Sequence, residues 1–321
     1  MARKALDLHC DTLMKIAKSG DLNENQSAMV TLKGLQEGGV ALQCFADFVP
    51  TGMFPKFCRK AATNAMFGKF YKNYQKMMAF HADTLFPILT AADIDKAGVD
   101  GKIGILLTIE DGGVLGDKLE NVKKYYDKGV RLVTLTWNHP NAIGYPNSKD
   151  PAIMEKGLTD FGKEVVAEME RLGMAVDVSH VSDGVFWDVA AIAKKPFLAS
   201  HSNARAVCGH TRNMTDDMIR KLAEKGGVMG LNIGPEFITF GSEESTVDGM
   251  VKQILHIREV GGSDILALGS DFDGIHGKLE VAGPQDWPKL EKALSDAGLS
   301  DDELEKMWWT NAQRVLRAAL A

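Results

Sequence analysis

Short apolar runs alternate with amphipathic stretches along the whole chain. Eight of these runs are continuously apolar, which is typical of parallel strands that are buried on both faces. They cover residues 5–11, 40–49, 102–110, 130–137, 174–180, 196–201, 227–233 and 265–271. In the stretches between them, apolar residues recur at i, i+3 and i+4, and this spacing predicts helices. The clearest helices are expected over 160–172, 182–194, 215–225 and 245–260.

This repeating strand–helix unit predicts an α/β fold of the (β/α)8 (TIM) barrel type. Glycine precedes several strands, as at Gly129 and Gly173, where it suits the left-handed residue that closes the preceding helix. Eight strands spread over 321 residues favour one barrel domain spanning 1–321 over two Rossmann-type halves.

Two stretches depart from the repeat. Residues 50–90 form a long connection with a predicted helix over 59–80, and residues 138–158 are rich in Asn, Pro and Gly. Both follow strands, so we expect lids or substrate walls over the C-terminal face of the barrel. Residues 284–321 are predicted to form two helices that close the barrel.

Histidines and carboxylates stand where the apolar runs end. The residues that share this position are His9, Asp11, Glu110, His180, His201, Asp271 and Asp273. Each alone has an ordinary explanation as a helix cap, a solvated carboxylate or a hydrogen-bonded core histidine. Together they favour a hydrolytic metal site, because TIM barrels carry their active groups at the C-terminal ends of strands and the set contains imidazole and carboxylate without thiolate. From its position alone, Asp271 is either a ligand or a general acid/base.

The remaining polar candidates lie in loops and on helices. Arg212 follows His201 by eleven residues and could bind a substrate carboxylate through its planar fork, or be an ordinary surface charge. His139 lies in the Asn-rich loop, and His276 lies in a glycine-flanked loop without a clear role. The two histidines on helical patterns, assigned to structure or solvent, are His81 and His256.

Composition narrows the class of protein and its location. The net charge is −6 with acids and bases mixed, so no basic stripe favours a nucleic-acid partner. The four cysteines show no CxxC spacing and are interpreted as free thiols in a reducing compartment. No apolar run reaches the roughly 18 residues that span a bilayer, and the first strand begins too early for a signal peptide. We therefore expect a cytoplasmic protein without a membrane partner.

Through these motifs the chain resembles the renal (membrane) dipeptidase family, zinc metallopeptidases on a (β/α)8 barrel, and specifically a soluble bacterial-type member. The resemblance rests on ordered blocks along nearly the whole chain, and GxSxG, Walker A and HExxH motifs are absent from the sequence. The blocks are Asp7–Thr12, Thr108–Gly112, Leu135–Asn138, Asp177–Ser182, Ser200–Ala204, Thr211–Asn213 and Gly269–Gly274.

The resemblance implies a site with two zinc ions. His9 and Asp11 would hold the first ion, His180 and His201 the second, and Glu110 would bridge them. A hydroxide shared by the two ions would attack the scissile carbonyl.

The resemblance also gives roles to residues outside the ligand set. Asp271 matches the acid that moves a proton to the leaving amine, and Arg212 matches an arginine that binds substrate. Where mammalian relatives carry a substrate-binding histidine, this chain has Trp137, with His139 two residues on. Either His139 takes over that contact or the substrate contacts differ.

The implied function is hydrolysis of small dipeptides, L-D dipeptides included, by a dinuclear zinc dipeptidase that forms a homodimer. A lactonase or cyclic amidase on the same site is the alternative enzyme. A metal-containing but inactive barrel used for binding is the alternative from another class, and the intact ligand set with Asp271 argues against it.

Overall fold

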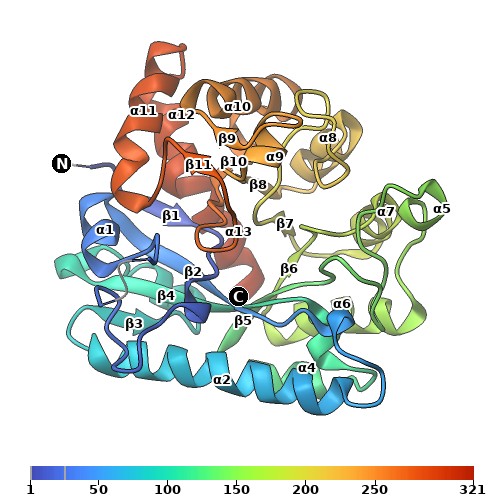
Figure 1. The fold of residues 1–321 in the computed structure, drawn as a ribbon. Helices are drawn as coiled ribbons and strands as arrows, with labels where there is room; N and C mark the ends of the chain where they lie inside the picture. Colours follow the sequence, from blue (N-terminus) through green and yellow to red (C-terminus); the bar gives the residue numbers. More distant parts are fainter. Residues whose placement is uncertain (1, 25–26) are drawn as a thin grey trace.

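A computed structural model describes residues 2–24 and 27–321 of the protein. Within them, eight parallel strands close into a barrel with helices around it (Figure 1). The barrel strands are β1 (Ala5–Asp7), β2 (Val40–Phe48), β4 (Ile103–Glu110), β5 (Val130–Thr134), β6 (Ala175–Asp177), β7 (Leu198–Ala199), β8 (Val228–Leu231) and β10 (Leu266–Leu268). Pairing of Asp7 with Leu268 joins β1 to β10, and β2 pairs with β4 along Leu42–Phe48, which closes the ring. The predicted (β/α)8 barrel is confirmed.

The helices that follow the strands begin where the sequence predicts. The longer ones are α2 (Arg59–Phe80), α6 (Asp160–Leu172), α7 (Asp183–Ile192), α8 (Asp216–Glu224) and α10 (Val247–Gly261). The shorter ones are α1 (Leu32–Glu37), α3 (Ala91–Ile94), α4 (Glu120–Tyr126), α5 (Pro151–Met154) and α9 (Pro235–Ile238). The helices α6, α7, α8 and α10 each start at a Ser or Thr whose hydroxyl accepts a hydrogen bond from a backbone N–H in the first turn, namely Thr159, Ser182, Thr215 and Thr246.

Most strands are shorter than the apolar runs that encode them. The runs over 174–180 and 265–271 give strands of only three residues. Beyond each strand the backbone is irregular, with φ of +66° at His180 and +63° at Asp271, in the left-handed region. These polar residues therefore lie in the loops that leave the strands rather than in the strands themselves.

The connection over 50–90 runs along the side of the barrel. In Figure 1, α2 lies along the outside of the barrel wall, and its Phe67, Phe70 and Met77 are buried in the core between helices and barrel. Next comes a strand that the sequence analysis did not predict, β3 (Leu85–Pro87), which pairs with the first residues of β4. The apolar face of α2 is thus buried against the barrel, and the lid or substrate wall expected for residues 50–90 stays a prediction.

The C-terminal segment closes the barrel at the N-terminal ends of its strands. It forms α11 (Trp287–Asp296), α12 (Asp301–Glu305), a π-helical turn and α13 (Asn311–Leu320), where two helices were expected. Val315 and Leu316 of α13 pack with barrel-interior residues such as Leu6 and Leu106. This plug at the N-terminal ends of the strands leaves the C-terminal ends as the open face.

The remaining features of the fold are a short ribbon, the state of the cysteines and the character of the helices. A small parallel ribbon, β9 (Glu244–Ser245) with β11 (Lys278–Leu279), joins the loops after β8 and β10. All four cysteines are free thiols, as predicted. No helix among the described residues is long and apolar enough to cross a membrane.

Candidate metal centre

The barrel brings the predicted histidines and carboxylates together at its open face. Glu110 is the last residue of β4, whereas the others stand two to four residues beyond the ends of their strands. All are buried, and the set comprises His9, Asp11, Glu110, His180, His201 and Asp271. Because the strands are parallel, their C-terminal ends meet on one rim, which explains how five distant segments converge.

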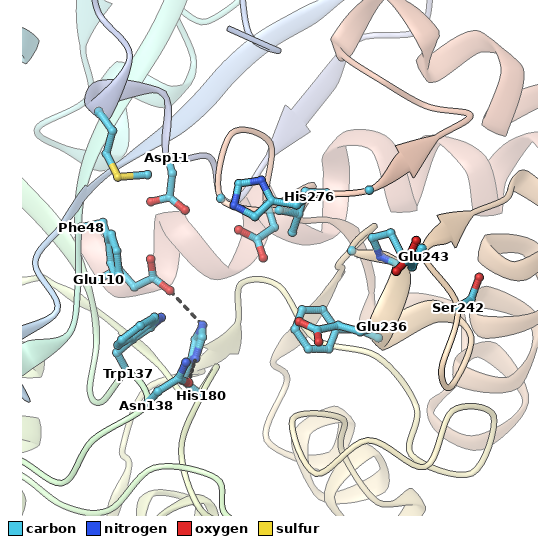
Figure 2. A pocket seen from close by; sticks show the side chains of 18 residues that line it. Asp11, Phe48, Glu110, Trp137, Asn138, His180, Glu236, Ser242, Glu243 and His276 are labelled. Atoms are coloured by element: carbon cyan, nitrogen blue, oxygen red, sulfur yellow. Dashed lines mark hydrogen bonds and ion pairs between the residues drawn. The ribbon is translucent and has the colours of Figure 1, made fainter. Parts of the chain in front are cut away.

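Glu110 lies at the middle of the cluster (Figure 2). Its Oε1 is 2.9 Å from His180 Nε2 and 3.6 Å from His201 Nε2, while its Oε2 is 3.6 Å from His9 Nε2. Asp11 Oδ2 lies 3.6 Å from the same His9 nitrogen.

Two groups of potential ligands therefore share Glu110. We call His9, Asp11 and Glu110 the first half-site, and Glu110, His180 and His201 the second half-site. In each group the ligand atoms lie within 4.8 Å of one another, as they also do in an overlapping group of His9, His201 and Asp271.

Hydrogen bonds set the tautomers of both histidines of the second half-site. The Ser200 hydroxyl donates to Asp177 Oδ2 at 2.6 Å and lies 2.6 Å from His201 Nδ1, so that nitrogen carries the proton and donates to Ser200. His180 Nδ1 lies 3.2 Å from Asn138 Oδ1, which can only accept. Both Nε2 lone pairs thus point at the centre, 3.0 Å apart, with no proton to share between them. An ion between them would relieve this arrangement.

The first half-site contains buried polar atoms without partners. The two ring nitrogens of His9 have no hydrogen-bond partner among the described residues, and neither does Asp11 Oδ1. A buried polar group left in this way costs about 1–3 kcal/mol. Nitrogen and oxygen ligands without sulfur suit Zn²⁺ and related divalent ions, so these residues fit a dinuclear centre.

The charges of the cluster lead to the same conclusion. Burial, with the charge of Asp11, raises the pKa of Glu110 to about 8, and burial raises the pKa of Asp271 to about 7 although His9 opposes it. Burial works against a charged His9, yet Glu110 and Asp11 raise its pKa well above the usual range. The carboxylates exceed the local positive charge, and divalent cations would supply what is missing.

Asp271 stands beside the centre with one oxygen held and one directed inward. Its Oδ2 accepts a hydrogen bond from Asn232 Nδ2 at 2.9 Å, and its Oδ1 lies 3.9 Å from His9 Nε2. Sequence reasoning did not find Asn232, although it directly follows β8 and occupies the same strand-end position as the ligands. It also did not assign Asn138, Ser200 or Asp177, because their contacts form only between neighbouring loops.

Arg212 is buried next to the second half-site. Its Nη1 donates to Ser202 Oγ and its Nη2 to the His201 carbonyl, at 3.1 and 3.0 Å, while Nε has no partner among the described residues. Burial lowers the pKa of Arg212 to about 10. The surface-charge alternative for this residue is therefore wrong.

Trp137 and His139 differ in their relation to the cavity. Trp137 lines it and packs edge-on against Phe48, with ring centroids 4.9 Å apart. His139 is exposed and packs closely against Gly52. A Cβ added at Gly52 would lie only 2.1 Å from the Cβ of His139. The geometry gives Trp137, and not His139, a place in the wall. His276 also lines the cavity. His81 accepts a hydrogen bond from the Leu22 N–H, and His256 is hydrogen-bonded to Asp216, so both lie outside the site.

The cavity above the centre has a volume of about 540 Å³. Its inner wall includes Asp11, Glu110, His180 and Asp271, and Asn138 contributes from the 138–158 loop. A volume of this order accommodates a small molecule. Residues 50–90 do not contribute to this cavity.

A (β/α)8 barrel with such a cluster at its open face defines the class of metal-dependent barrel hydrolases. The sequence profile of the membrane dipeptidase family (peptidase family M19) matches residues 2–321. The chain belongs to this family, and the resemblance drawn from the sequence motifs is confirmed.

Individual relatives agree with this assignment. An uncharacterized dipeptidase of Schizosaccharomyces pombe is 36% identical over 220 residues, 67% of this chain and 53% of the relative. The crystal structure of a dipeptidase of family M19 superimposes with a TM-score of 0.89 at 25% identity, covering 100% of this chain and 99% of the other. A metallopeptidase of Rhodobacter sphaeroides, with a phosphinate mimic of L-Ala-D-Ala bound, has the same fold, with a TM-score of 0.87, 24% identity and coverage of 99% and 100%.

Proposed function

We propose that the protein is a dinuclear zinc dipeptidase that hydrolyses the peptide bond of small dipeptides, L-D dipeptides included. The observation that carries this proposal is Glu110, whose two oxygens face two separate groups of ligands. Membership of a metallopeptidase family supports both the use of metal and the reaction. The dipeptide mimic in the Rhodobacter sphaeroides structure motivates the choice of L-D dipeptides.

The residues divide into two sets of ligands and one shared ligand. His9 and Asp11 would hold one ion, His180 and His201 would hold the other, and Glu110 would contact both. Two bound ions would polarise the scissile carbonyl and make a water molecule nucleophilic near neutral pH.

Asp271 is the proposed general acid/base. Asn232 holds its Oδ2, so its Oδ1 is the oxygen available on the side of the cluster. In this role the carboxylate takes a proton from the attacking water and delivers it to the nitrogen of the leaving amine. The elevated pKa of Asp271 reflects its burial and suits a group that must both accept and release a proton.

Arg212 is the proposed partner of a substrate carboxylate. Its guanidinium is held by Ser202 and the His201 carbonyl, which places a fixed positive charge next to the second half-site. A charge-assisted contact with the dipeptide C-terminus would orient the scissile bond. Trp137 would form an apolar side of the cavity above the metal centre.

The experiment that tests this function combines metal content with turnover. Purified protein is expected to contain close to two zinc ions per chain, and a chelator is expected to abolish hydrolysis of L-Ala-L-Ala and L-Ala-D-Ala until zinc is returned. Asp271→Asn is expected to retain zinc while kcat falls by about 10²–10⁴-fold, the range for loss of a general acid/base. The exposed Asp296→Asn serves as control.

Two outcomes would contradict the proposal. One is full activity of metal-free protein. The other is turnover of lactones or cyclic amides that exceeds turnover of dipeptides, which would favour the alternative hydrolase. The homodimer and the cytoplasmic location stay predictions from the sequence.

A further inference from the structure

The wall of the cavity opposite the ligand cluster is acidic. Figure 2 shows Glu236 and Glu243 across the cavity from Glu110 and His180. Glu236 belongs to α9, and Glu243 directly precedes β9. The two carboxylates therefore come from the loop after β8, which is not part of the ligand set.

Neither carboxylate is neutralised by an ion pair among the described residues. The neighbouring lysine, Lys278, pairs with Glu244 at 2.9 Å instead. The Glu243 main chain is fixed by the ribbon, because its carbonyl accepts the Lys278 N–H at 2.9 Å. Both side chains are exposed, so the negative charge of this wall is available to a ligand.

The cations near the cavity gather on the other side of Glu236. Arg212 and Lys149 line an adjoining cavity of about 400 Å³, which shares His180 and Glu236 with the first. The combined space therefore has a basic lobe near Arg212 and an acidic lobe near Glu243. A ligand that spans it would lie with its anionic end in the basic lobe and its cationic end in the acidic lobe.

An observation outside the ligand cluster marks the combined space as a ligand site. Arg212 lines the adjoining cavity, and its Nε is buried without a hydrogen-bond partner among the described residues. The two glutamates thus face a space in which another group also lacks a partner.

We propose that Glu236 and Glu243 select dipeptides whose N-terminal residue has a cationic side chain, such as lysine or arginine. This inference rests on the proposed dipeptidase function. A dipeptide brings one carboxylate, which fits the basic lobe, and one α-ammonium group. Two wall carboxylates exceed that single ammonium by one, and a basic side chain supplies the second positive charge.

The test compares Lys-Ala with norleucine-Ala, which has an aliphatic side chain but no charge, and uses Ala-Ala as the reference. For the zinc-loaded enzyme we expect kcat/KM to favour Lys-Ala over norleucine-Ala by about fivefold, since exposed charge pairs contribute modestly. The preference should shrink as salt is added, because salt screens exposed charges. The double variant Glu236→Gln/Glu243→Gln should bring the ratio close to one, whereas Glu244→Gln, next to Glu243 but outside the cavity, should leave it unchanged.

Each other result counts against the inference. Equal turnover of Lys-Ala and norleucine-Ala by the wild type would overturn it and leave the proposed function intact, provided Ala-Ala is hydrolysed. An equal loss for all three dipeptides in the double variant would also overturn it, because the glutamates would then bind the α-ammonium that every dipeptide carries. Failure of the zinc-loaded protein to hydrolyse any dipeptide would overturn both proposals together.

Discussion

The two half-sites of the candidate metal centre differ in how their histidines are held. In the second half-site, each Nδ1 has a hydrogen-bond partner, Asn138 for His180 and Ser200 for His201. In the first, His9 has no partner on either nitrogen among the described residues and stacks on the His201 ring at 3.8 Å between centroids. The protein itself therefore orients the second half-site, whereas the first would need a bound ion to complete the contacts of His9.

The difference is notable because the same kind of aspartate–serine pair lies below each half-site. Below the first, Asp7 accepts hydrogen bonds from the Ser270 hydroxyl at 2.6 Å and backbone N–H at 2.9 Å. Below the second, Asp177 accepts the same two bonds from Ser200 at the same distances. Ser270, however, reaches the His9 carbonyl, while Ser200 reaches the His201 ring. Equivalent supports thus orient a backbone in one case and a metal ligand in the other.

The largest expected effect comes from the residue that both half-sites share. Glu110→Gln removes the one carboxylate that faces both groups, so activity is expected to fall by about 10³-fold or more, roughly 4 kcal/mol of transition-state stabilisation. Bound zinc should fall below two ions per chain. Metal analysis and dipeptide turnover measure both effects, with the exposed Glu120→Gln as control. Two retained ions with normal turnover would show that the half-sites are independent of Glu110.

A smaller effect tests the difference between the half-sites directly. Titration of metal-free protein with zinc against a competing chelator is expected to resolve two affinities, the tighter one belonging to the second half-site. Ser200→Ala should weaken the tighter affinity by about 10–100-fold, as is usual when the partner of a ligating histidine is lost. Ser270→Ala is the matched control and should change both affinities less. Equal effects of the two variants would refute the comparison.

A test of stability rather than of activity extends the comparison of partnered and unpartnered groups to the outer face of the barrel. Asp47 of β2 is buried on the same face as Phe45 and Val49, and neither of its oxygens has a partner among the described residues. Burial raises the pKa of Asp47 to about 9. The folded protein therefore keeps a proton there that the unfolded chain releases near its usual pKa of about 4.

Protonation of Asp47 makes the free energy of unfolding depend on pH. Above pH 4 the unfolded chain binds fewer protons than the folded protein, so this residue lowers the free energy of unfolding as pH rises, by about 1.4 kcal/mol per pH unit up to pH 9. Asp47→Asn should remove this slope between pH 6 and 8 and leave dipeptide hydrolysis intact. Denaturant unfolding at several pH values measures it. An unchanged slope in the variant would mean that Asp47 is ionised in the folded protein.

Much of the fold and of the ligand set could be predicted from the sequence. Continuous apolar runs predicted the barrel strands because both faces of a parallel strand are buried, and helix periodicity predicted α6 and α8 almost to the residue. The strand ends near His180 and Asp271 were misjudged, since the positive φ of these two residues leaves little trace in residue type. The placement of α2 was also missed, because loop length alone does not show which surface a helix covers.

The sequence by itself determined that the chain forms a metal-site barrel, because the order of apolar runs and the polar residues that end them are local properties. The tertiary structure alone decided the rest. It placed Glu110 between the two half-sites, gave Asn138 and Ser200 to the second, left His9 without partners, and moved His139 out of the cavity wall. These features depend on distances between segments far apart in the chain, and such distances exist only once the strands close into a ring.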